Sequence, residues 1–166
     1  MNDVLTTLQE FYREALARLL RHEANARLIP QYDVNNTYQY IINREETHLS
    51  WVGTAILELA GRVDEEPSQH DATNREHMKR DKGDAGRRAI EADAHDAAQF
   101  VERWRPRVAA MPNARHAKML GVILGEVLEQ HRFFEQARAG RTDLLGRRGE
   151  QLEPASGEVL PERWIG

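Results

Sequence analysis

The sequence contains no cysteine among its 166 residues. This absence excludes disulfide bonds, thiolate zinc sites and cysteine nucleophiles, and it leaves the redox compartment undetermined. No stretch approaches the roughly 18 consecutive apolar residues of a transmembrane helix, so we expect no membrane span. The first residues, MNDVLTTLQEF, are amphipathic and lack a basic segment followed by an apolar one. We therefore expect no secretory signal and a cytoplasmic protein.

An excess of positive charge is also missing. Lysine and arginine together number 23, against 27 aspartate and glutamate residues, which gives a formal net charge of −4. The arginines are scattered among acidic residues, so the composition predicts no general attraction to nucleic acid. Hydrophobic residues make up 40% and charged residues 30%. This balance and length are typical of one helix-rich domain with its own core.

Four long segments have helical periodicity, and no segment resembles a strand. The first covers about residues 3–28, with apolar residues at the i, i+3, i+4 spacing of one helix face, and it ends before Pro30. The second covers about residues 34–62, with Asp33 or Asn35 as its N-cap.

The third and fourth helices follow a polar stretch of about twenty residues. The third begins near Asp84, and Pro106 is expected to kink it or end it early. The fourth follows the Met-Pro-Asn sequence at 111–113 and extends to about Arg138. Residues 141–166 lack helical periodicity.

Connection lengths predict how the helices are arranged. The first two helices and the last two are joined by short loops, so each pair should form an antiparallel hairpin. The connection between the pairs is long enough to run back along the bundle. The sequence therefore predicts an all-α fold over residues 1–140, a ferritin-like four-helix bundle with one crossover. An up-down-up-down bundle with a long middle loop is the alternative.

Two features indicate contacts beyond a single bundle. The fourth helix is apolar on more than one side, because Val122 and Leu128 add to its core-facing stripe. The irregular tail, residues 141–166, carries Leu160, Trp164 and Ile165. We expect the tail to dock on the bundle or on a partner subunit, and we expect a homodimer formed through the fourth helix and the tail.

Glu45 lies at the centre of the apolar face of the second helix. A buried carboxylate without a partner is costly, so the other helices must supply one. At about 1.5 Å per residue, polar residues of all four helices fall within a layer roughly 12 Å thick. The members of this layer are Glu23, Glu45, His48, Asp93, Glu126 and His131. Such a layer is organised by a metal or by mutual hydrogen bonds, and a salt bridge from Glu45 to Arg18 or Arg87 is the alternative.

The segment Glu45-Glu46-Thr47-His48 resembles the Glu-x-x-His motif of ferritin-like di-iron carboxylate proteins, such as rubrerythrins and bacterioferritins. Residues three apart share a helix face, so the carboxylate can bridge two metals while the imidazole binds one of them. In that family two helices each supply a glutamate, and the other two each supply a Glu-x-x-His motif. The resemblance implies metal ligands at Glu23, at Glu45 and His48, at Asp93 or Glu91, and at Glu126 and His131.

The fourth helix departs from this pattern, because the residue three positions before His131 is Leu128. Glu126 lies five positions before His131 and faces inward only if the helix has a wide core face or a π-bulge. The implied cofactor is iron or manganese, as one ion or a pair, with oxidase- or peroxidase-type chemistry. Without cysteine, a rubredoxin-type electron relay within the same chain is excluded.

Two other functions fit the same sequence. The segment ETHLSWV resembles the second-helix histidine of DinB-like metal-dependent bundles, although the fourth helix lacks the expected His-x-x-x-His. A metal-free bundle that serves as an interaction module is the other alternative. Four of the other histidines are expected at the surface: His70 and His77 in the crossover, and His95 and His116 on the helices.

Overall fold

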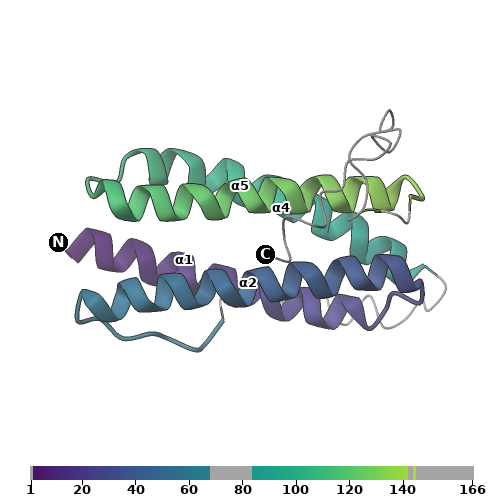
Figure 1. The fold of residues 1–166 in the computed structure, drawn as a ribbon, viewed down its shortest axis with the longest axis horizontal. Coiled ribbons are helices and arrows are strands. Elements are labelled where there is room, and N and C mark those ends of the chain that lie inside the picture. The colour runs from purple at the N-terminus through teal and green to yellow at the C-terminus, as the bar shows by residue number, and fades with distance from the viewer. Residues whose placement is uncertain (1, 68–83, 142–143, 145–166) are drawn as a thin grey trace, which may run out of the picture.

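The computed structural model describes residues 2–67, 84–141 and 144. Within these residues the chain forms four α-helices and no strand. Their bounds are α1 Asn2–Ala26, α2 Tyr32–Glu58, α4 Ala85–Ala109 and α5 Ala114–Arg138 (Figure 1). The prediction of an all-helical bundle is confirmed. None of these helices is both long and apolar enough to cross a membrane.

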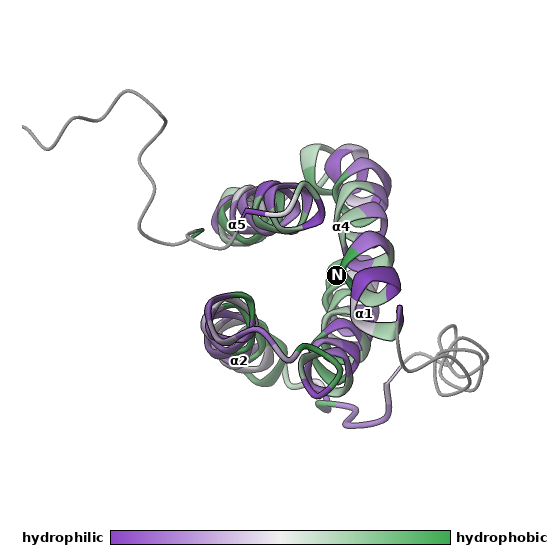
Figure 2. Cartoon of the chain, turned by 90° about the vertical axis from the view of Figure 1, so that its right-hand side faces the viewer, coloured by the Kyte–Doolittle hydropathy of each residue, from purple (hydrophilic) through white to green (hydrophobic). Residues whose placement is uncertain are grey.

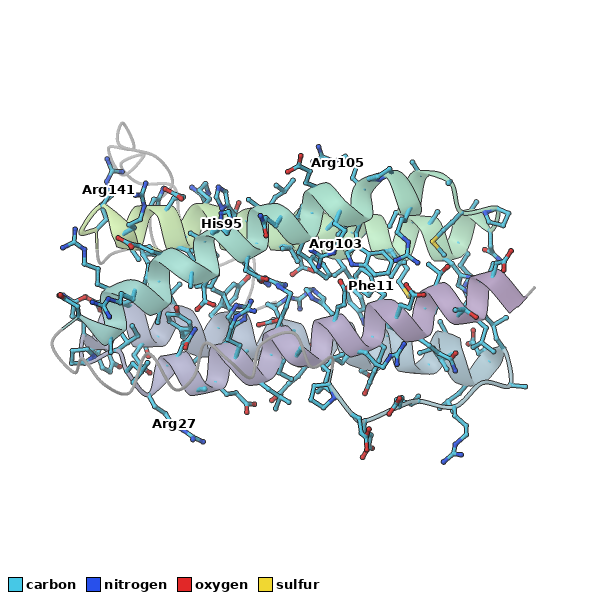
Figure 3. All side chains as sticks on the ribbon, turned by 180° about the vertical axis from the view of Figure 1, so that it is seen from behind. Phe11, Arg27, His95, Arg103, Arg105 and Arg141 are labelled. Atoms are coloured by element: carbon cyan, nitrogen blue, oxygen red, sulfur yellow. The ribbon has the colours of Figure 1, made fainter. Side chains whose placement is uncertain are left out.

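The four helices lie side by side around a common core (Figure 2). Helix α1 packs mainly against α2, and α4 packs mainly against α5. Fewer contacts join α2 to α5 and α1 to α4. Phe11 of α1 points between the helices (Figure 3), where its ring lies 5.4 Å from that of Phe100 and 4.9 Å from that of Trp104. This aromatic cluster joins α1 to α4.

Close contacts show which helix ends lie together. A Cβ added to Gly86, near the start of α4, would lie 2.7 Å from the carbonyl oxygen of Leu28. Helix α4 therefore begins at the end of the bundle that holds the α1–α2 loop. At the opposite end, Glu58 of α2 lies 3.6 Å from Arg115 of α5. The connection from α2 to α4 includes residues 68–83, which lie outside the described residues.

Helix α2 ends at Glu58, four residues before the predicted position 62. Ala60 adopts a left-handed conformation with φ of 59°. The amide of Ala60 donates to the carbonyl of Leu57, and the amide of Gly61 donates to that of Ile56. This pair of bonds is the Schellman pattern, which satisfies the last carbonyl groups and stops the helix.

The predicted N-cap of α2 is wrong, because the helix begins earlier, with Gln31 as the N-cap. Asp33 lies within the first turn instead. The side-chain amide of Asn35 donates to the carbonyl oxygens of Ala26 at 2.7 Å and Ile29 at 3.3 Å. Asn35 therefore satisfies free carbonyl groups at the end of α1 and ties the two helices together.

Helix α4 continues to Ala109, so Pro106 does not end it early. Helix α5 begins where predicted, because the Asn113 side chain accepts hydrogen bonds from the amides of Arg115 and His116. The expectation that His116 faces solvent is wrong, since this residue is buried at the start of α5. His95 is exposed, as predicted (Figure 3).

The structure tests only one residue of the predicted tail contact. Leu144 is buried in the core cluster. The other apolar tail residues, Leu160, Trp164 and Ile165, lie outside the described residues, as do His70 and His77.

Candidate functional site

Glu45 is buried and lies between two side chains of α1. One of its oxygens contacts Nδ1 of His22, and the other lies 3.9 Å from a guanidinium nitrogen of Arg18. His22 is completely buried, and Arg18 is 4% exposed. The partners that Glu45 requires are therefore an imidazole and an arginine, and the arginine is one of the two proposed in the salt-bridge alternative.

Asp93 of α4 is the second buried carboxylate, and its side chain has no exposed surface. Three groups donate to it: the Tyr38 hydroxyl at 2.6 Å, the Asn25 amide at 2.9 Å and Nε of Arg21 at 3.1 Å. Nε2 of His22 lies 3.7 Å from the same carboxylate. His22 thus lies between Glu45 and Asp93.

Asp96, one turn further along α4, extends this group of charges. It accepts a hydrogen bond from Nε of Arg18 at 2.9 Å and forms an ion pair with Arg21. Burial alone would raise the pKa of Asp96, but the two guanidinium groups together lower it below its usual range. Arg18 also donates to the side-chain oxygen of Gln130 on α5 at 3.1 Å.

We call this group the inner charged layer. It consists of Arg18, Arg21, His22, Asn25, Tyr38, Glu45, Asp93, Asp96 and Gln130. All four helices contribute to it, and three carboxyl groups face two guanidinium groups. Burial and the adjacent Asp93 raise the pKa of Tyr38 well above its ordinary value, so the phenol remains a hydrogen-bond donor.

Two buried polar atoms of the inner charged layer have no hydrogen-bond partner among the described residues. They are Nε2 of His22 and Nε2 of Gln130. A buried donor or acceptor without a partner is destabilising by about 1–3 kcal/mol. The layer is therefore densely but incompletely hydrogen-bonded.

His48 lies elsewhere, although it belongs to the same motif as Glu45. Its Nε2 lies 2.8 Å from a carboxylate oxygen of Glu126 on α5. Arg44 holds the same carboxylate through two bonds, at 2.7 and 2.9 Å. The Trp51 ring lies 5.5 Å from the imidazole. We call these four residues the α2–α5 seam.

The α2–α5 seam is more open to solvent than the inner charged layer, because the side chains of Arg44 and Glu126 are 34% and 28% exposed. Burial lowers the pKa of His48, and the nearby Glu126 only partly opposes this effect. The hydrogen bond from Arg44 lowers the pKa of Glu126, with a further contribution from His48. The seam therefore favours a neutral imidazole beside an ionised carboxylate.

The remaining predicted ligands lie apart from both groups. Nδ1 of His131 lies 2.8 Å from the backbone carbonyl oxygen of Ala94, so this imidazole ties α5 to α4. Glu23 is only partly buried. Glu91 is exposed and lies 3.7 Å from Arg87. The predicted ligands are thus distributed over several environments.

The donor set in the described residues does not fit the dinuclear centre that the resemblance implies. No three histidine, aspartate or glutamate side chains converge there as a metal-ligand set. On α5, the side chain that reaches the inner charged layer is Gln130, and the buried residue three positions earlier is Val127. The second Glu-x-x-His that the resemblance implies is therefore absent at these positions, where the chain has Val127 and Gln130. Iron and manganese sites use carboxylates and imidazoles.

Of the α1 residues in the inner charged layer, sequence reasoning named Arg18, as an alternative partner of Glu45, and missed Arg21, His22 and Asn25. The apolar stripe of α1 includes Leu8, Phe11 and Ala15. Continuing it at steps of three and four leads through Arg18, His22 and Asn25, which are all buried. The resemblance implies Glu23 as the α1 carboxylate, whereas this stripe leads to His22, one position earlier.

Comparison of the chain with protein-family models, with curated proteins and with solved structures gives no match.

Proposed function

We propose that this protein is a ferritin-like bundle whose core layer is held together by arginine in place of metal ions, and that it acts as an interaction module. The observation that carries this proposal is the position of Arg18 and Arg21. Arg18 is buried and Arg21 is mostly buried, with side chains 5% and 13% exposed, and both guanidinium groups contact carboxylates of the inner charged layer. They supply the positive charge that a metal ion would otherwise bring, and they repel an incoming cation.

The ends of the helices support the ferritin-like topology. Helices α2 and α4 both begin at the end that holds the α1–α2 loop, where Gly86 lies against Leu28. Two antiparallel hairpins joined by a crossover along the bundle have this arrangement. Figure 1 is consistent with it, since α1 and α5 approach this end while α2 and α4 leave it.

The surface formed by α2 and α5 supports the interaction role. Tyr40 and Trp51 on α2, and Val122 on α5, are all more than a third exposed, and Val122 lies one turn before Glu126, which contacts α2. A Cβ added to Gly125, which is exposed about 60° around α5 from Val122, would meet nothing within 4 Å, so another helix can approach closely. We propose that a second copy of the chain covers this surface in a symmetric dimer, with the tail contributing.

Oligomeric state tests the interaction role. Wild-type protein should be a dimer in sedimentation velocity experiments, and Val122→Glu should convert it to a folded monomer. Leu57→Glu is the matched control, since Leu57 is exposed on α2 but lies about 120° around the helix from Trp51. A wild-type monomer at all concentrations would remove the dimer from the proposal.

Metal response tests the arginine-for-metal substitution. Mn²⁺, or Fe²⁺ under anaerobic conditions, should leave the melting temperature of the wild type unchanged. Arg18→Ala and Arg21→Ala together should lower it, because they leave buried carboxylates without their partners. Stabilisation of the wild type by stoichiometric metal would contradict this proposal.

Metal binding is the second candidate, and one observation favours it. Nε2 of His22 is buried and has no hydrogen-bond partner in the described part of the chain. The imidazole lies between the carboxylates of Glu45 and Asp93. Imidazole and carboxylate suit iron or manganese. On this alternative metal raises the melting temperature of the wild type, and Glu45→Ala abolishes the rise. Inductively coupled plasma analysis of the purified protein gives an independent measurement.

A further inference from the structure

A cavity of about 520 Å³ lies at the end of the bundle that holds the α1–α2 loop. Its wall is formed by the α1–α2 loop, the first two turns of α4, and the end of α5. The apolar lining residues are Leu28, Ile29, Pro30, Ile90 and Ala137. Its size is within the range of about 300–1,000 Å³ that is typical of small-molecule sites.

The charged residues that line this cavity are all arginines: Arg27, Arg87 and Arg138. Arg138 is bonded to Glu135, and Arg87 lies near Glu91, but these pairs are at the surface and cost little to rearrange. Arg27 has no ion pair with another described residue and is exposed at this end of the bundle, where Arg141 also lies (Figure 3). The cavity therefore combines an apolar wall with a positively charged rim.

A cavity at the opposite end provides an internal comparison. It is larger, about 710 Å³, and is lined by Arg13 and Arg62 together with Asp64, Glu65 and Glu66. Opposite charges are mixed there, so the site has no preference for one sign of ligand. Uniform positive charge is thus a property of the first cavity and not of both ends.

Helix ends of both kinds meet around the first cavity, because α2 and α4 begin there while α1 and α5 end there. Their partial charges are of opposite sign and largely offset one another. The arginines therefore set the sign of the charge at the rim.

We propose that this cavity binds a small organic anion that carries an apolar body and one phosphate or carboxylate group. The apolar body contacts Ile29 and Ile90, and the acid group lies at the rim among the arginines. An anion without an apolar part gains only screened charge attraction. An apolar molecule without an acid group gains no charge attraction.

Isothermal titration calorimetry with hexyl phosphate tests the proposal on the full chain. Wild-type protein should bind one equivalent, and affinity should fall as salt rises. Inorganic phosphate and hexanol, used as separate probes, should each bind at least tenfold more weakly. Arg87→Gln with Arg138→Gln should weaken binding of hexyl phosphate about tenfold, and Arg27→Gln should weaken it about threefold, because each removes positive charge from the rim.

Arg13→Gln with Arg62→Gln is the matched control, because it removes the same charge at the opposite end and should leave affinity unchanged. If both double variants lost affinity for hexyl phosphate equally, the proposed site would be wrong, since only the total charge of the protein would then matter. Equal affinity for inorganic phosphate or for hexanol would overturn the ligand class. Circular dichroism of each variant establishes that its helices are intact.

Discussion

The two halves of one motif, Glu45 and His48, lie in two different environments. Glu45 belongs to the inner charged layer and is held by His22 and Arg18. His48 belongs to the α2–α5 seam and is held by Glu126. Residues three apart on a helix differ in direction by about 60°, which is enough to face different neighbours. A Glu-x-x-His spacing therefore does not by itself bring both groups to one site.

The environments differ in how much water reaches the charges. In the inner charged layer, Asp93 is fully buried and has three hydrogen-bond donors from protein. In the α2–α5 seam, Glu126 is partly exposed and water can replace its partners. Removing a partner should therefore be costly in the layer and mild in the seam.

Asp93→Ala is expected to have the largest effect. It leaves the buried side chains of Asn25 and Tyr38 without their acceptor and removes one of the two carboxylates that Arg21 contacts. Breaking such a network costs about 3–5 kcal/mol of unfolding free energy. Urea denaturation followed by circular dichroism measures the loss. Glu91→Ala, an exposed residue two positions away, is the control and should change stability by about 0.5 kcal/mol or less. Equal effects would refute the structural role of the layer.

Glu45→Gln is expected to have an intermediate effect. The substitution keeps the side-chain shape but removes the charge that faces His22 and Arg18, at a cost of about 2 kcal/mol. Chemical denaturation at neutral pH gives the value. A neutral or stabilising outcome would mean that the inner charged layer gains nothing from this carboxylate.

Glu126→Gln should cost less, about 1 kcal/mol, because solvent screens the partly exposed pair with Arg44. The cost should shrink further when salt is raised, which the same denaturation experiment in about 1 M sodium chloride measures. If Glu126→Gln lost as much unfolding free energy as Asp93→Ala, or if its loss did not depend on salt, the α2–α5 seam would not differ from the inner charged layer in solvent screening.

The smallest expected effect is a pH dependence at His48. Its pKa is lowered from 6.5 by burial, so the unfolded chain binds a proton more readily than the folded one. The associated stability is present above the unfolded pKa and is lost as pH falls below about 6.5. His48→Gln should lack this loss between pH 7.5 and 5.5, measured by thermal melts. Parallel profiles for wild type and variant would show that His48 contributes no pH dependence.

The local pattern of the sequence was sufficient to predict the four helices and the burial of Glu45. Periodicity of apolar residues, Pro30 and the Asn113 cap act over a few residues, so the helix bounds follow closely from the chain. The absence of a strand among the described residues and the exposed apolar residues of α5, Val122 and Leu128, also follow from this pattern.

The partners of the polar residues depend on how each helix is rotated against the others. A rotation of α1 by about 100° exchanges Glu23 for His22 on the inner face. Glu126 and His131 are five residues apart, so they point about 140° apart on a regular helix and cannot both face inward. Gln130, between them in direction, faces the layer and accepts from Arg18 across 112 positions of sequence. Packing of the aromatic core fixes these rotations and so decides which helix each buried polar residue meets.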